Sequence, residues 1–60
     1  MKLATPKRRY QVAVDALVLA AIRLEDEVTQ HGPDVIGARG RLRLAAHDCA
    51  VAARVAGVVP

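Results

Sequence analysis

The stretch His31-Gly32-Pro33-Asp34 interrupts the chain between two long segments whose apolar residues have helical spacing. Glycine readily adopts the left-handed conformation that ends a helix, and proline cannot continue one. Asp34 belongs to a residue type that commonly precedes the next helix. The stretch therefore predicts a tight turn between two antiparallel helices, with Gly32 in the left-handed position.

The first segment is predicted to be a helix from Pro6 to about His31. The hydroxyl of Thr5 can cap the first N–H groups, and proline suits the first helical position. Apolar residues then follow in alternating steps of three and four, which is the spacing of a face packed on another helix. They are Tyr10, Val14, Leu17, Ala21, Leu24 and Val28. A second apolar patch, Val12, Ala16 and Leu19, lies on nearly the opposite side.

The second segment is predicted to be a helix from residue 35 to about residue 56, ended by Gly57. Gly37 and Gly40 each cost ~1 kcal/mol relative to alanine, so this helix could begin as late as Gly40. One stripe along it is made mostly of small residues, namely Leu42, Ala45, Cys49, Ala52 and Ala56. The other stripe is larger and comprises Leu44, Asp48, Val51 and Val55.

The predicted fold is all-α, a single two-helix antiparallel hairpin over residues 1–60. Its parts are a helix over 6–31, a turn over 32–34 and a helix over 35–56. Packing the large residues of the first helix on the small residues of the second leaves one apolar stripe on each helix unused. A chain of 60 residues also buries little core by itself. The sequence therefore predicts a homodimer or higher oligomer, most simply a dimer that forms a four-helix bundle.

The residues expected in that protein interface belong to the two unused stripes. They are Val12, Leu19, Leu44, Asp48, Val51 and Val55. Asp48 is the polar member of an otherwise apolar stripe, and two interpretations remain open for it. Either it reaches solvent from a half-buried stripe, or it is a polar element that sets the register of an oligomer.

The charge of +3 is unevenly distributed, with basic clusters at residues 7–9 and at Arg39, Arg41 and Arg43. The hairpin brings the second cluster beside the acidic residues 25–27, which favours cross-helix ion pairs. The other interpretation is a contact with a phosphate or another anion, since arginine binds such groups in two-pronged fashion. Tyr10 is the one aromatic residue, so the sequence offers no platform on which bases could stack.

The sequence contains no recognisable catalytic or metal-binding pattern. His47, Asp48 and Cys49 are adjacent, but successive residues of a helix point ~100° apart, so the His47 and Cys49 side chains diverge. With one cysteine, no disulfide can form within the chain. No phosphate-binding loop or nucleophile motif is present. We therefore expect no enzymatic activity, no metal and no cofactor.

The function expected from these observations is a small non-enzymatic interaction or regulatory protein that binds itself or another protein through an Ala/Leu/Val helix face. A cytoplasmic location is expected, and seven arginines against two lysines with no asparagine suggest an actinobacterial or phage source. The apolar run 12–22 is too short to span a bilayer. Two alternatives remain: a basic nucleic-acid-binding protein that uses Arg39, Arg41 and Arg43, and an amphipathic protein of membrane surfaces.

Overall fold

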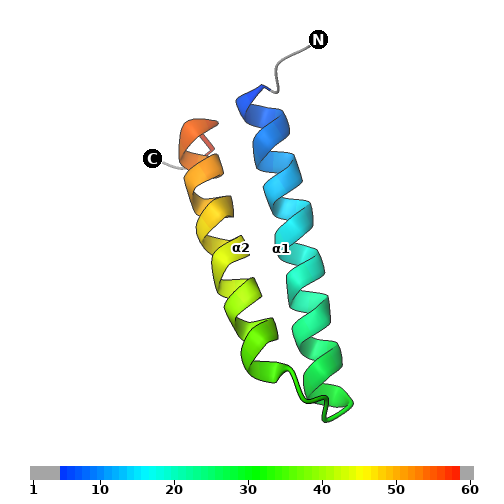
Figure 1. The fold of residues 1–60 in the computed structure, drawn as a ribbon. Helices are drawn as coiled ribbons and strands as arrows, with labels where there is room; N and C mark the ends of the chain where they lie inside the picture. The colour runs from blue at the N-terminus through cyan, green and yellow to red at the C-terminus, as the bar shows by residue number, and fades with distance from the viewer. Residues whose placement is uncertain (1–4, 59–60) are drawn as a thin grey trace.

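The computed structural model describes residues 5–58, which form two α-helices joined by a tight turn (Figure 1). Helix α1 spans Pro6–Thr29 and helix α2 spans Val35–Val55. The two helices run antiparallel and lie side by side, so the N-terminal turns of α1 are next to the C-terminal turns of α2. The prediction of an all-α helical hairpin is confirmed.

Helix α1 begins with the cap that the sequence predicts. The backbone of Thr5 is extended, and its hydroxyl oxygen accepts a hydrogen bond from the Arg8 N–H at 3.2 Å. Pro6 occupies the first turn, where its missing N–H removes no helical hydrogen bond. Together these two residues fix the N-terminal boundary of the helix.

Both helices end in the same hydrogen-bonded motif, in which two consecutive N–H groups bond back to carbonyls of the last turn. In α1, His31 donates to the Val28 carbonyl at 3.3 Å and Gly32 donates to the Glu27 carbonyl at 2.8 Å. In α2, Gly57 and Val58 make the equivalent bonds to the carbonyls of residues 54 and 53. These are Schellman motifs, which satisfy the carbonyl groups that a helix end leaves unpaired.

The left-handed residue at the end of α1 is His31, with φ of 52°, so its assignment to Gly32 is wrong. Helix α1 ends at Thr29 with Gln30 as its C-cap, which is one residue earlier than a left-handed Gly32 would require. The left-handed residue of a Schellman motif directly follows the cap, and that position falls on His31. At the end of α2 the same position holds Gly57, with φ of 74°, as the sequence predicts.

Helix α2 begins immediately after Asp34, so Gly37 and Gly40 lie inside the helix and do not delay its start. Asp34 occupies the cap position, but its side chain makes no capping hydrogen bond. Its carboxylate accepts a hydrogen bond from Arg41 instead, two turns further along α2. The Asp34 N–H donates to the Glu27 carboxylate at 3.3 Å, which ties the turn to the end of α1.

The interface between the helices is thin and rich in alanine. Within residues 5–58 the buried residues are Ala38, 1% exposed, and Ala53, 6% exposed. Around them lies a half-buried layer of larger side chains from α1 and mostly small ones from α2. From α1 it includes Tyr10, Ala13, Val14, Leu17, Ala20 and Leu24, and from α2 it includes Val35, Leu42, Ala45, Cys49, Ala52 and Ala56.

Two residues that the sequence assigned to the contact between the helices are exposed, namely Ala21 and Val28. The half-buried Ala20 takes the place of Ala21. Ala20 lines the same hollow as the fully buried Ala38, so small side chains meet where the two helices approach. Val28 lies in the last turn of α1, beside the connecting turn, where α2 offers little to cover it.

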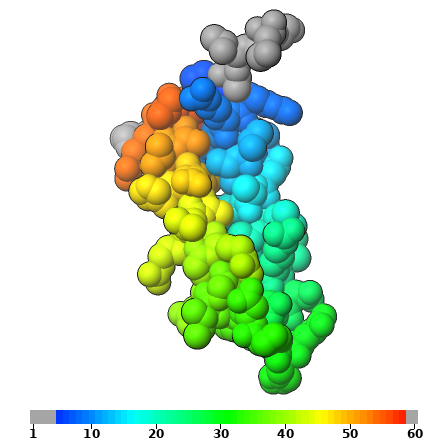
Figure 2. Space-filling view, viewed as in Figure 1, coloured from blue at the N-terminus to red at the C-terminus, as the bar shows by residue number. Residues whose placement is uncertain are grey.

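The hairpin is a single layer, only 13 Å across in its thinnest direction. Figure 2 shows side chains of the two helices in contact along the hairpin, with no third element over them. Each helix therefore has one neighbour, and both broad faces of the layer are exposed. Large apolar residues lie on both faces, among them Val12, Leu19, Ile22, Ile36 and Leu44.

His31 provides a test of the turn. A left-handed backbone costs about 1–2 kcal/mol for a residue with a Cβ, whereas glycine adopts it freely. His31→Gly is therefore expected to raise the free energy of unfolding by about 0.5–1 kcal/mol, measured by circular dichroism in urea at fixed protein concentration. Gly57→Ala is the matched opposite change and is expected to lower it. A His31→Gly protein no more stable than the parent would contradict the assigned backbone.

Candidate interaction face

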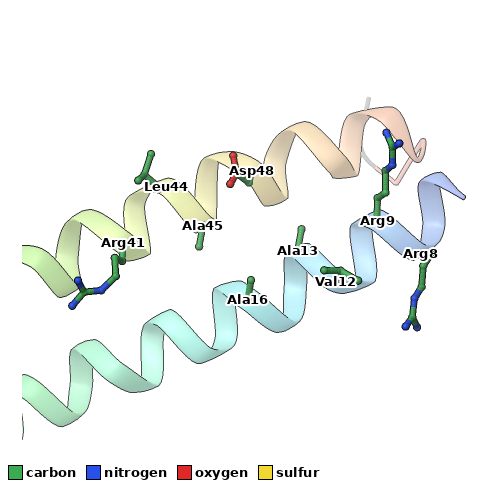
Figure 3. Close-up of a pocket in the computed structure, with 9 residues that line it drawn as sticks. All are labelled: Arg8, Arg9, Val12, Ala13, Ala16, Arg41, Leu44, Ala45 and Asp48. Carbon is green, nitrogen blue, oxygen red and sulfur yellow. The ribbon is translucent and has the colours of Figure 1, made fainter. Parts of the chain in front are cut away.

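The two stripes that the hairpin leaves unpaired lie on the same broad face of the molecule. Between them runs an open groove of about 630 Å³. Its lining is drawn in Figure 3 and comprises Arg8, Arg9, Val12, Ala13, Ala16, Arg41, Leu44, Ala45 and Asp48. The groove therefore takes residues from the first half of α1 and from the middle of α2.

Alanines form the floor of this groove. Ala13 and Ala16 point from α1 toward α2, and Ala45 points from α2 toward α1 (Figure 3). Leu44 and Val12 stand on either side of them and are both exposed. Because the floor residues are short and the flanking residues are long, the surface is shaped to receive side chains from another helix.

Two further hollows continue the groove along the hairpin. Toward the open end, one of about 350 Å³ shares Arg9 and Asp48 with the groove and adds Val51 and Val55. Toward the turn, one of about 230 Å³ shares Ala16, Arg41 and Ala45 with it and adds Leu19, Ala20, Arg23 and Ala38. We call this continuous surface the groove face.

Each of the six residues proposed from the sequence as a protein interface lines some part of the groove face. Val12 and Leu44 line its centre, Leu19 lies toward the turn, and Val51 and Val55 lie toward the open end. Asp48 lines both the centre and the open end. The sequence treated the two stripes separately, and the hairpin brings them together as one surface.

Asp48 is an acid without a partner on this face. Its carboxylate makes no hydrogen bond or ion pair with another residue of the 5–58 segment. The groove around it is apolar apart from arginines, because Arg8 and Arg9 lie toward one end and Arg41 toward the other. An unpaired acid in such a lining is suited to meet a cation from outside the hairpin.

The arginines expected to act together are divided between the two faces. Arg41 belongs to the groove face, where its guanidinium forms an ion pair with the Asp34 carboxylate at 2.6 Å. Arg39 and Arg43 line a separate hollow with Ile36 and Gly40. Arg39, Arg41 and Arg43 therefore do not form one basic patch.

The acidic residues at the end of α1 are engaged locally and not with these arginines. Glu25 accepts from the Thr29 hydroxyl at 3.3 Å, and Asp26 accepts from the Gln30 amide at 3.0 Å. Glu27 accepts from the backbone of the turn. The expected ion pairs from residues 25–27 to Arg39 and Arg41 are thus replaced by the single pair between Arg41 and Asp34, which is closer along the chain.

The adjacent residues His47, Asp48 and Cys49 point in different directions, as helical geometry requires. His47 is exposed, while Cys49 is half-buried in the layer between the helices. Across the described part of the chain, no three His, Cys, Asp or Glu side chains lie close enough together to hold a metal ion. Neither α1 nor α2 is both long and apolar enough to cross a membrane.

Sequence reasoning missed Ala13 in the floor of the groove and the presence of Arg9 beside it. Ala16 belonged to the predicted patch with Val12 and Leu19, but Ala13 gave no signal beyond helix propensity, and Arg9 was counted only as part of a basic N-terminal cluster. The signal that could have found them is the antiparallel pairing itself. Once two helices face each other in opposite directions, residues on matching flanks of each helix lie on one face of the hairpin.

Two glycines of α2 test the contact that holds Arg41. A Cβ at Gly40 would meet no atom within 4 Å, so Gly40→Ala is expected to stabilise the hairpin by about 1 kcal/mol. A Cβ at Gly37 would collide with the Asp34 carboxylate and displace it from Arg41. Gly37→Ala should therefore raise the free energy of unfolding by less than Gly40→Ala does, or not at all, when both are measured by urea titration. Equal gains from both changes would contradict the placement of Asp34.

Comparisons with protein-family models, with curated proteins and with solved structures found no match to this chain.

Proposed function

We propose that this chain is a small non-enzymatic protein-interaction module that first binds a second copy of itself. Two hairpins pack groove face to groove face and form a four-helix bundle. The observation that carries this proposal is the convergence of both unpaired apolar stripes on one grooved surface. A bundle of four helices gives each helix two neighbours in place of one.

The energetic support is the small amount of surface that the hairpin buries alone. No side chain larger than alanine is buried within residues 5–58, although 53% of the sequence is hydrophobic. The accessible surface is 4965 Å², whereas a compact monomer of this length exposes roughly 3,800 Å². The excess is on the order of the ~800 Å² that each partner loses in a stable interface.

The shape of the groove face also fits a helical partner. Helices in bundles pack about 8–10 Å apart, and the shorter distances require small residues at the contact. The alanine floor supplies them, and Leu44 and Val12 stand beside the floor as side chains that can enter the groove of a second copy. Because the groove and the side chains that can fill it lie on the same surface, this surface can pack against an identical one on a second copy.

A second candidate function is anion or nucleic-acid binding by the opposite face. Arg39 and Arg43 lie one helical turn apart, are exposed, and make no ion pair within the described segment. Two arginines at that spacing can contact neighbouring phosphates. We favour the interaction module, because Arg41 is turned to the other face and held by Asp34.

Leu44 tests the proposed bundle directly. Leu44 is 66% exposed at the groove, so a charged residue there does not destabilise a single hairpin. In the proposed dimer the same substitution would bury one charge from each copy, at a cost in free energy. Leu44→Asp is expected to weaken self-association by at least ~100-fold, measured by sedimentation equilibrium at micromolar concentration.

Ile36→Asp is the matched control, because Ile36 is 87% exposed and lies away from the groove, in the hollow with Arg39 and Arg43. Its dimer should form as in the parent protein. A parent chain that sediments as a stable, fully helical monomer would refute the proposal, and so would a loss of association from Ile36→Asp alone.

The second candidate function makes a separate prediction. Replacing Arg39 and Arg43 together with alanine should leave the dimer unchanged, because neither residue lines the groove face. Binding of duplex and single-stranded DNA or RNA is then measured at low salt by fluorescence anisotropy. Tight, salt-sensitive binding that this double variant abolishes would favour nucleic-acid binding as the function.

A further inference from the structure

We propose that the second copy packs antiparallel on the groove face, about a two-fold axis perpendicular to the helices, so that Arg41 of each copy pairs with Asp48 of the other. This inference rests on the self-association proposed above and adds the orientation and the register of the two copies. The axis passes between Leu44 and Ala45 of α2.

The spacing of the charged residues along α2 carries the register. Arg41 and Asp48 are seven residues apart, which returns a helix to the same face after two turns. Both line the groove, with Leu44 and Ala45 midway between them. Rotation about an axis through that midpoint exchanges position 41 with position 48 and position 44 with position 45. Two α2 helices crossing there place an arginine against an acid at both ends of the contact.

The same axis crosses α1 near Ala16, which lines the groove together with Leu44 and Ala45. Small residues from both helices therefore lie at the centre of the proposed contact, where two layers must approach most closely. Val12 and Leu19 lie on either side of this centre along α1. Each would pack against the corresponding stripe of the other copy.

The distribution of charge between the ends of the hairpin selects the antiparallel orientation. The turn end, residues 17–43, carries four acids and four arginines. The open end, residues 5–15 and 47–58, carries four cations and two acids. An antiparallel dimer places the neutral turn end of one copy over the cationic open end of the other, whereas an axis parallel to the helices would place the two cationic ends together.

The existing partner of Arg41 does not prevent this exchange. Its ion pair with Asp34 is exposed, with both side chains 54% accessible, and pairs of that kind contribute little to stability. Asp48, in contrast, has no hydrogen-bond or ion-pair partner among residues 5–58 of its own hairpin. The axis also places Arg9 opposite Arg23, and these long side chains can carry their charges to the rim of the bundle.

The test uses two charge reversals in the full chain, Arg41→Asp and Asp48→Arg. Each variant alone opposes like charges at both contacts of its own dimer, so each should self-associate on the order of 100-fold more weakly than the parent. Mixed in equal amounts, the two variants restore an arginine against an acid at both contacts. Native mass spectrometry, which separates the three possible dimers by mass, should then show the heterodimer.

Arg43→Asp mixed with Asp15→Arg is the control pair, because neither residue lines the groove face. Both control variants should form dimers like the parent and mix without preference. Circular dichroism follows folding, and variants that unfold alone should regain helix on mixing.

The outcomes distinguish this inference from the proposal beneath it. A parent dimer whose Arg41→Asp and Asp48→Arg variants form no heterodimer, or still form parent-like homodimers, overturns the register and leaves self-association standing. A parent chain that is monomeric overturns both. A mixture that stays unfolded also overturns the register, since restored pairs should restore the fold.

Discussion

The thickness of a single helical layer is the constraint on which the rest of this structure depends. In a hairpin each helix has one neighbour, so each can cover only the residues that face that neighbour. The neighbour here is lined with alanines, and the buried side chains of the described segment are Ala38 and Ala53. The larger apolar residues therefore lie at the edge of the contact or outside it, and their burial requires another molecule.

The turn decides which residues lie outside. The first Schellman motif and the hydrogen bond from the Asp34 N–H to Glu27 set where α1 ends and α2 begins, while the Thr5 cap and the second Schellman motif set the two outer ends. Those boundaries fix the rotation of each helix about its axis relative to the other. Because both helices turn the flank that includes Val12 and Leu44 to one side, the groove is a direct consequence of the turn.

The architecture could be predicted from the sequence because its signals are local. Thr5-Pro6, the break at residues 31–34 and Gly57 each act through their own backbone, and the structure has caps or turns at all three. The exchange of Gly32 for His31 shows the limit of such signals. The left-handed position depends on the turn at which the helix stops, and a shift of one residue costs only about 1–2 kcal/mol.

The site was less predictable because it depends on relations between the helices. Both stripes could be predicted from the sequence, but their union on one face follows from the antiparallel pairing and from the small rotation that exchanged Ala21 for Ala20 in the contact. The ion pairs were harder to predict than the apolar stripes. Residues 25–27 and Arg41 have complementary charge. Asp34 nevertheless lies at the start of the same helix as Arg41, and it forms the ion pair in their place. Surface ion pairs differ too little in free energy for composition alone to rank them.

Arg41 links the fold to the proposed assembly, because it has two possible acidic partners, Asp34 at the start of its own helix and Asp48 of a second copy. In the single hairpin it binds Asp34, and in the proposed dimer it would exchange Asp34 for Asp48 of the second copy. Association then gains the burial of Leu44 and its neighbours but must replace one ion pair with another. The charged pair therefore contributes mainly to the choice of partner and register, and the apolar stripes contribute most of the affinity. A polar residue within an apolar interface commonly has this division of roles, which gives the unpartnered Asp48 a physical reason to stand where it does.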